Sequence, residues 1–257
     1  MTDIKYTRLV LGKDIELDSG PFVHIPTIKE MMDLKDREFG NYSGPFTRSI
    51  RELFSYSAEV DQIEEQFPSL WEAAQDEQMD AACGPLFGAP LLSTAFIQGF
   101  AYWMRKDVSE FDRMSNGKFI NKQLNLVIDQ EFFNDFCHVI TACTVVEKDM
   151  DLIAPKDMSK TQRSLWDKLY KGRLRKLEKN QTELGDKILI LSVASGGSFK
   201  FSDIENLTYY QFECLLRAHL EREVTDRTFA IYTAYKFDTK DMKFEDWTEK
   251  VGLVKTT

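Results

Sequence analysis

The clearest hydrophobic pattern lies near the C-terminus, where apolar side chains recur at helical spacing after Thr208. The residues at i, i+3, i+4, i+7 and i+8 share one face of a helix. They are Phe212, Leu215, Leu216, His219 and Leu220. Thr208 is a favourable N-cap for this helix, and we expect Phe212, Leu216 and Leu220 to be core residues. Further helical stretches are expected around Phe229 to Tyr232 and over residues 244–251.

Capping patterns predict several more helices. Thr27 followed by Glu30 forms a capping box, and that helix should end near Gly40-Asn41. Further helices are expected to begin at the capping pairs Ser69 with Glu72 and Ser159 with Gln162, and at the single residues Asp129 and Thr182. The segment 188–193 also has the composition of a buried strand. However, residues 184, 188, 191 and 195 share a helical face and Gly196-Gly197 is a natural helix stop, so we expect a helix.

Two hairpins complete the expected fold. Residues 6–11 and 14–17 flank Gly12-Lys13, a two-residue turn that begins with glycine, as hairpins prefer. Residues 118–128 contain a second candidate, whose second arm alternates apolar and polar positions. The expected fold class is mainly α-helical with minor β, the hairpins packing on a helical bundle. Ser115–Gly117 is the best boundary, giving lobes 1–114 and 115–257, while one continuous domain remains open.

The stretch between Asp80 and Arg105 contains no charged residue. Proline at 85 and 90 interrupts it, which leaves only residues 91–104 as a continuous apolar run. A membrane span needs about 20 residues, so we expect a buried core helix and no membrane partner. The N-terminus lacks the apolar region of a signal peptide, and the four cysteines form no Cys-x-x-Cys pair. These features favour reduced thiols and a cytoplasmic location.

Charge is unevenly distributed along the chain. The net charge is −9 and the pI about 5.0, which disfavours a phosphate backbone as the default partner. Residues 52–104 hold nine acids and no lysine or arginine, whereas residues 156–179 hold nine basic residues and three acids. Such an asymmetry is usually a pair of solvated faces, but it can also orient a partner or dock one lobe on another. The role of the acidic region 52–104 stays open.

The basic segment 156–179 raises nucleic-acid binding as an alternative. Arg163, Arg173 and Arg175 lie there with Trp166 and Tyr170 between them, and aromatic side chains stack on bases. Because Trp166 and Tyr170 are four residues apart, we expect them instead to cover the apolar side of that helix.

Candidate catalytic and metal sites lack the spacing that their chemistry requires. Cys137, His138 and Cys143 are the nearest approach to a ligand cluster, but adjacent helical residues point about 100° apart. Residues 195–198 (Ser-Gly-Gly-Ser) lack the Gly-Lys-Ser/Thr of a phosphate loop. No histidine adjoins a nucleophile signature. We therefore expect no catalytic, cofactor or metal residue and no enzyme activity.

The order of elements at both ends resembles proteins encoded in the tail modules of phages of Gram-positive hosts. At the N-terminus the resemblance rests on residues 9–17 and on Ile25-Pro26-Thr27-Ile28-Lys29-Glu30. At the C-terminus it rests on a basic helix, an apolar helix, the segment 206–212 (Asn-Leu-Thr-Tyr-Tyr-Gln-Phe) and the ending 247–253. The acidic middle has no counterpart in that family.

This resemblance implies a non-enzymatic tail assembly chaperone in the host cytoplasm, with tape-measure and tail-tube proteins as partners. The alternative is a structural component of the virion tail or neck, and self-association stays open. The expected partner-binding residues are aromatic anchors and arginines, which are frequent at interfaces. They are Tyr209, Tyr210, Phe229, Tyr232, Arg173 and Arg175. The competing interpretation is that the aromatic residues pack two helices together.

Overall fold

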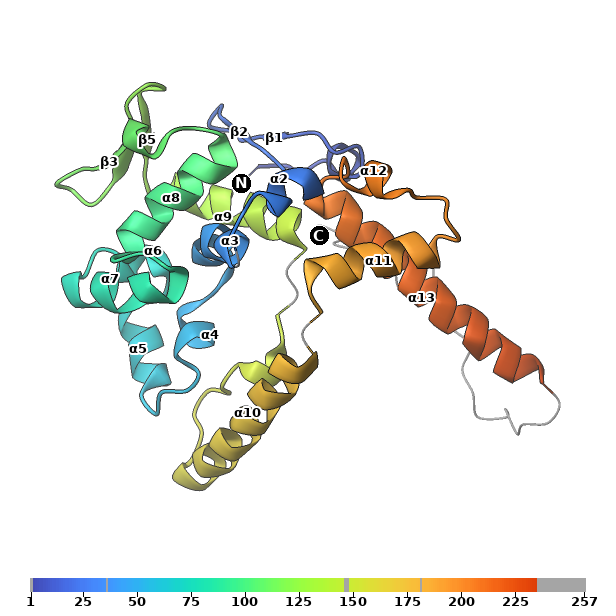
Figure 1. Ribbon diagram of the computed structural model, residues 1–257. Coiled ribbons are helices and arrows are strands. Elements are labelled where there is room, and N and C mark those ends of the chain that lie inside the picture. Colours follow the sequence, from blue (N-terminus) through green and yellow to red (C-terminus); the bar gives the residue numbers. More distant parts are fainter. Residues whose placement is uncertain (1, 36, 146–147, 181, 235–257) are drawn as a thin grey trace. The chain divides into compact units, whose positions relative to one another are not determined.

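The computed structural model describes residues 2–35, 37–145, 148–180 and 182–234, and it is mainly α-helical with two small antiparallel sheets (Figure 1). The expected fold class is confirmed. The chain forms two compact units, each built from segments that are distant in sequence. The first contains Met1–Asp3, Ile15–His24 and Leu34–Gln181, and the second contains Ile4–Asp14, Ile25–Asp33 and Thr182–Thr257.

The first unit contains the larger set of elements. Its helices are α3 (Glu38–Thr47), α4 (Ile50–Phe54), α5 (Val60–Gln66), α6 (Leu70–Ala73), α7 (Glu77–Cys83), α8 (Leu92–Met104), α9 (Gln130–Thr144) and α10 (Lys160–Asn180). Short 3₁₀ turns are η1 (Gly84–Phe87), η2 (Val108–Glu110) and η3 (Met150–Leu152). Its strands are β1 (Ile15–Glu16), β2 (Phe22–Val23), β3 (Phe111–Arg113), β4 (Phe119–Asn121) and β5 (Leu126–Ile128).

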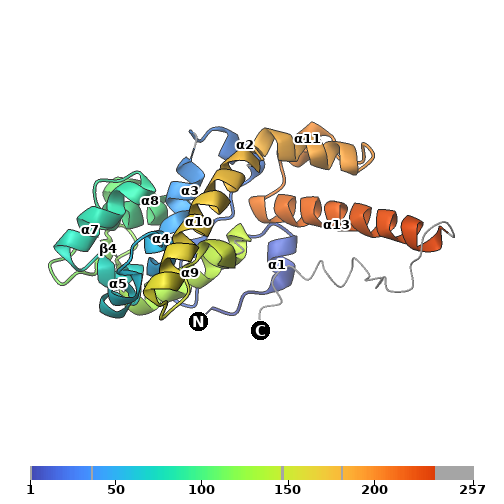
Figure 2. The ribbon, with the colours of Figure 1, turned by 90° about the horizontal axis from the view of Figure 1, so that it is seen from below.

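The core of the first unit lies where α3, α8 and α9 pack together (Figures 1 and 2). An aromatic cluster fills this core. The ring centroid of Phe46 lies 4.9 Å from that of Phe136 and 5.2 Å from that of Phe100. Gly99 permits the close crossing of α3 and α8, because a Cβ there would lie 2.3 Å from the Phe46 ring. The expected buried helix at 91–104 is therefore present as α8.

Among the described residues, no single helix has both the length and the hydropathy of a membrane span. The segment Glu77–Phe87 and α8 meet those criteria only when counted together across a 49° bend.

The N-terminal hairpin exists, but its first arm was placed wrongly. Tyr6–Val10 is helix α1, and Gly12, with φ of 64°, follows its end instead of turning a hairpin. The two paired strands are β1 and β2, with Ile15 opposite Val23. The segment is too short for its hydrophobic pattern to distinguish a strand from a helix. In the structure it forms a single helical turn, and Leu9 is its buried residue.

The second predicted hairpin is confirmed and extended. Strands β4 and β5 pair antiparallel with Phe119 opposite Ile128, and β3 adds a third strand on the other side of β4. Ser115–Gly117, the expected lobe boundary, lies in the turn between β3 and β4, where the amide of Gly117 bonds the carbonyl of Met114. The two units therefore do not divide at residues 114–115.

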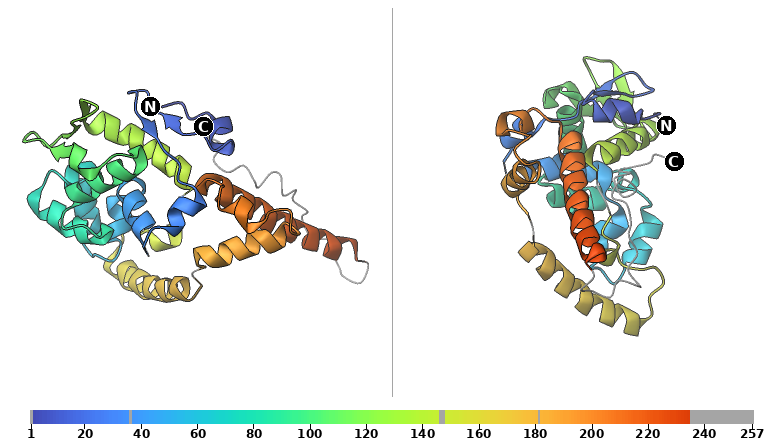
Figure 3. Two further views of the ribbon diagram at one scale, coloured as in Figure 1. Left: turned by 45° about the horizontal axis from the view of Figure 1, so that its top comes forward. Right: turned by 90° about the vertical axis from the view of Figure 1, so that its right-hand side faces the viewer.

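The second unit brings the N-terminal segments onto the C-terminal helices. It contains α1, α2 (Ile28–Met32), α11 (Leu184–Ala194), α12 (Phe201–Ile204) and α13 (Tyr209–Thr233). Helices α11 and α13 run alongside each other (Figures 2 and 3). The core between these elements is formed by Ile28, Leu191, Ile204, Phe212 and Leu216. The helix expected to open at Thr182 is confirmed as α11, although its N-cap is Glu183, and Gly196 and Gly197 follow its end with positive φ.

Two helix boundaries differ from expectation. The capping box of Thr27 and Glu30 is present, but α2 ends at Met32 and α3 runs through Gly40-Asn41. Arg37, with φ of 70°, separates the two helices, and no sequence signal marks that conformation. In the second case, α13 continues to Thr233 as one helix, so the stretch around Phe229 is its second half. The predicted helix over 244–251 lies outside the described residues.

Candidate functional site

The second unit contains an open groove of about 770 Å³ between α11 and the middle of α13. Its α11 side is apolar, and Leu189, Ile190 and Val193 have exposed fractions of 55%, 38% and 71%. Its α13 side carries polar residues, including His219 and the ion pair of Arg222 with Asp226 at 3.7 Å. An apolar wall facing a charged rim is the arrangement found at protein-binding surfaces.

A second exposed apolar stripe lies on α13, on a different face of the helix from the groove. Leu220, Val224 and Ile231 are 42%, 54% and 44% exposed, and helical spacing places the three within about 40° of one another. Helix α13 is about 37 Å long and α11 about 16 Å, so α11 cannot cover the whole of its neighbour. Exposed apolar side chains on both helices mark a surface suited to another helix.

The structure separates the four predicted aromatic anchors into two pairs. Phe229 and Tyr232 are 52% and 46% exposed and lie on the second half of α13. Tyr210 is fully buried, and Tyr209 packs against the core of the unit. Burial, and then the neighbouring carboxylate of Glu213, raise the pKa of Tyr209. The packing interpretation therefore holds for Tyr210, which is not an accessible anchor, while Tyr209 is partly buried against the core.

The groove residues of α11 were expected only as part of a helix interior. The signal that identifies them is present in the sequence, because residues 188–191 and 193 are apolar. Such a run places apolar side chains on more than one face of a helix, and a single neighbouring helix covers one face. Leu191 lies on the buried face of α11, whereas Leu189, Ile190 and Val193 lie on other faces and are exposed.

The predicted arginines lie in the first unit, on α10. Arg173 already binds a residue of its own unit. Its guanidinium donates to the carbonyl of Asp151 at 2.6 Å and pairs with the Asp151 carboxylate at 3.0 Å. Arg175 is exposed. Trp166 is buried and stacks on Tyr170 with ring centroids 4.6 Å apart. The expected covering role of this aromatic pair is confirmed for Trp166, which is not accessible for stacking on a base.

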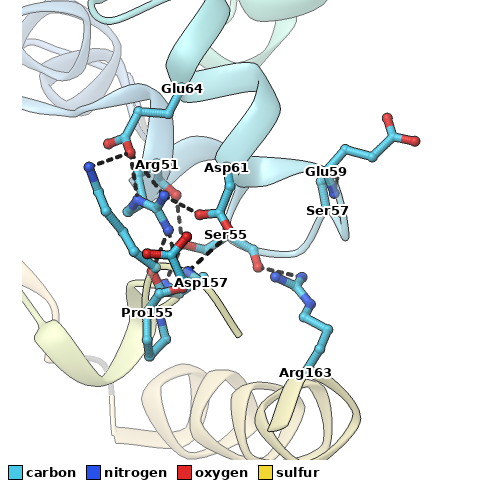
Figure 4. A network of polar contacts seen from close by, with 11 residues as sticks. Arg51, Ser55, Ser57, Glu59, Asp61, Glu64, Pro155, Asp157 and Arg163 are labelled. Atoms are coloured by element: carbon cyan, nitrogen blue, oxygen red, sulfur yellow. Dashed lines mark hydrogen bonds and ion pairs between the residues drawn. The ribbon is translucent and has the colours of Figure 1, made fainter. Parts of the chain in front are cut away.

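A polar network joins the acidic and basic segments inside the first unit (Figure 4). Arg51 is 7% exposed, and its guanidinium donates to Glu64 at 3.0 Å, to Asp61 and to the carbonyl of Ala154 at 2.8 Å. Arg163 of α10 donates to the carbonyl of Ser55 at 2.8 Å. Lys156 of the basic segment pairs with Glu64 of the acidic segment at 3.1 Å, so part of the charge asymmetry helps to hold α10 and the segment before it on α4 and α5. We call these contacts the Arg51 network.

The described residues provide little for covalent or metal chemistry. No group of three or more His, Cys, Asp or Glu side chains among them is placed to hold a metal ion. The four cysteines are free thiols, and burial raises the pKa of Cys83 to about 11 and that of Cys137 still further. A thiol with a raised pKa is a poor nucleophile at neutral pH.

One family model matches part of the chain. It is described as the YomV second domain and matches residues 176–252, a segment that includes α11, α12 and α13. The family is phage-derived, from YomV of Bacillus phage SPBc2, and the match points to a phage protein. No curated protein and no solved structure matches the chain. The matched segment contains the groove and the exposed half of α13.

Proposed function

We propose that this phage protein is non-enzymatic and acts as a tail assembly chaperone, binding apolar helical segments of tape-measure or tail-tube proteins in the host cytoplasm. The observation that carries the proposal is the exposed apolar surface of α11 and α13. Its accessible members are Leu189, Ile190, Val193, Leu220, Val224, Phe229, Ile231 and Tyr232. We call these residues the α11–α13 surface.

The chemistry of this surface suits such a partner. An unassembled helical protein exposes apolar stripes that aggregate, and a groove between two helices can accept one such stripe through anchors at helical spacing. The polar residues along α13 would keep the surface soluble when no partner is bound. The match of this segment to a phage-derived family supports its use in a phage process.

The test is co-expression of this chain with the tape-measure protein encoded by the same phage. We expect a higher soluble yield of that protein with the chain than without it. Val193→Glu should abolish the gain, because it places a charge on an apolar wall that the partner must contact. Met150→Glu is the matched control, since Met150 is 72% exposed and Val193 71%, and Met150 lies on η3 of the other unit. Equal yields for Val193→Glu and the unsubstituted chain would refute this surface as the binding site.

The alternative is a structural component of the virion tail or neck, and the same surface would then contact a permanent neighbour. Mass spectrometry of purified particles separates the two proposals. A chaperone is absent from particles or present in trace amount, whereas a structural component is present at a fixed copy number.

A further inference from the structure

The outward side of α10 carries a row of cations that the Arg51 network does not use. Lys160, Lys168, Lys171, Arg175 and Lys179 are all exposed, and helical spacing places them within an arc of about 100°. Among the described residues, none of the five forms an ion pair, whereas Arg163 and Arg173 on the inward side are both paired. We call these five residues the basic face.

Exposed leucines lie beside the basic face. Leu165 and Leu169 are 59% and 48% exposed and stand one helical turn apart on the side of α10 next to the cations. A phosphate backbone gains nothing from aliphatic side chains, whereas a protein surface with both apolar and acidic groups matches the two kinds of residue together. The burial of Trp166 also removes the aromatic platform that single-stranded nucleic acid would use.

A complementary surface exists elsewhere on the same unit. An open groove of about 880 Å³ lies beside β5 and the first turns of α9. Four carboxylates line it, those of Asp18, Asp129, Glu131 and Asp135, and no basic residue is among its described lining residues. Next to them lie two apolar residues, Leu126, which is half-buried, and Val127, which is 45% exposed. We call this the acidic groove.

Two of these carboxylates are fixed in place by the fold. Asp129 accepts a hydrogen bond from the amide of Phe132 at 3.1 Å and caps α9, and this bond is the main reason that its pKa lies below the usual range. Asp135 accepts from the amide and hydroxyl of Thr2. Glu131 is exposed at the rim. Lys118, which is not among the lining residues, pairs with Asp129 at 3.5 Å. The groove is therefore a negative surface with an apolar edge, and its net charge comes mainly from Asp18, Glu131 and Asp135.

We propose that the basic face of α10 docks into the acidic groove of a second copy of this chain. Each surface pairs one sign of charge with exposed aliphatic residues, so that the two are complementary in both respects. The chain's own α10 is held on α4 and α5 by the Arg51 network, which leaves the groove for α10 of another copy. Because the two surfaces differ, the contact is head-to-tail, and repeated contacts close a ring or extend a filament.

Ionic strength gives the first test, by analytical ultracentrifugation of the full chain. We expect masses above the 29.8 kDa of one chain at about 50 mM salt and a mass near 29.8 kDa at about 500 mM, because exposed charges are screened at high salt. A single mass of one chain at both salt concentrations would overturn the proposal.

Charge reversal on each surface gives the second test. Lys168→Glu with Lys171→Glu changes the basic face, and Glu131→Lys with Asn134→Lys changes the acidic groove at two exposed positions of α9. Each double variant alone should sediment as a single chain at low salt. An equal mixture should form a two-chain complex, since the intact basic face of one variant can dock into the intact acidic groove of the other. Lys13→Glu with Lys29→Glu reverses two exposed charges of the second unit and should assemble normally.

The mixture distinguishes loss of docking from loss of folding in the variants. Circular dichroism shows whether each variant is folded, and the neutral pair Lys168→Gln with Lys171→Gln gives a milder change that should weaken assembly in the same direction. Normal assembly of the groove variant, or failure of the mixture to form a two-chain complex, would overturn the proposal. Retention of duplex or single-stranded DNA that is lost only with the basic-face variant, together with normal assembly of the groove variant, would assign the basic face to nucleic acid.

Discussion

Arg51→Met tests whether the Arg51 network holds α10 and the segment before it on the first unit. The carbonyl of Ala154 is buried and would lose its donor, which costs about 1–3 kcal/mol. Asp61 and Glu64 are 45% and 25% exposed, so solvent and the ammonium group of Lys156, 3.1 Å from Glu64, partly replace the guanidinium. We count about 1 kcal/mol for those two ion pairs. The expected loss of unfolding free energy is therefore about 3 kcal/mol.

Hydrogen exchange followed by mass spectrometry measures this loss locally. The free-energy loss corresponds to a decrease in amide protection of about a hundredfold in the segments 50–66 and 154–170. Protection of α13 should be unchanged, because it belongs to the other unit. Arg227→Met is the control, since its ion pair with Glu223 is largely exposed and should contribute little. Unchanged protection around residue 154 in Arg51→Met would refute this account of how α10 is held.

The stability lost in Arg51→Met should depend on pH. Hydrogen bonds from Arg51 hold the pKa of Asp61 and of Glu64 below their ordinary values of 3.8 and 4.5. A carboxyl group whose pKa is lower in the folded state stabilises the fold above its unfolded pKa, and that stability is lost as the pH falls through the folded value. The difference in stability between Arg51→Met and the unsubstituted chain should therefore narrow below about pH 4. A constant difference between pH 7 and pH 3 would contradict the assigned ion pairs.

Four further substitutions are checked by thermal unfolding followed by circular dichroism. Leu216→Ala should cost about 2–5 kcal/mol because Leu216 is in the core, whereas Leu220→Ala should change stability little because Leu220 is 42% exposed. Gly99→Ala should cost about 1–3 kcal/mol or more, since its Cβ would collide with the Phe46 ring. Thr208→Ala should cost about 1 kcal/mol by removing the hydroxyl that accepts from the amide of Gln211 and caps α13.

Capping residues were the most reliable guide to the fold. Thr27, Ser69, Asp129 and Thr208 all cap helices through hydrogen bonds of their side chains with backbone amides. These bonds lie within three residues, so local sequence is enough to predict them. For the same reason the α9 helix and its buried face could be predicted from residues 129–143 alone.

The buried positions of α13 could be predicted from the local sequence only in part. Residues 212, 216 and 220 look equivalent in sequence, but each step of four residues rotates about 40° around a helix. After two steps Leu220 has turned about 80° from Phe212 and leaves the core face. Tyr210 was expected to bind a partner and is instead fully buried. Which side of a helix is covered depends on residues distant in sequence, and a single pattern does not contain that information.

The acidic region 52–104 had no assigned role from sequence. In the structure its residues contribute to the core of the first unit, and part of its charge pairs with partners outside the region. Asp80 is 3% exposed and accepts hydrogen bonds from Ser93 and from Arg113 of β3 at 2.7–2.9 Å. These partners lie 13 and 33 residues away along the chain, so no local spacing predicts them.

Two segments on which the expected resemblance rests, residues 25–30 and 206–212, belong to the same folded unit. The amide of Ile28 donates to the carbonyl of Leu207 at 2.9 Å, and the amide of Tyr209 donates to the carbonyl of Pro26 at 2.8 Å. Ile28 is fully buried with Phe212 in the core of that unit. The matched family segment 176–252 contains neither α1 nor α2.

A fragment limited to the matched segment would therefore lack Ile28 and expose the core that this side chain covers. Burying one isoleucine stabilises a fold by about 1.5–3 kcal/mol, and the backbone hydrogen bonds of α2 would be lost as well. The side chain of Gln211 would also lose its bond to the carbonyl of Val10 at 2.8 Å. The smallest unit expected to present the α11–α13 surface correctly thus includes residues 4–14 and 25–33, so binding by this surface is best measured on the full chain.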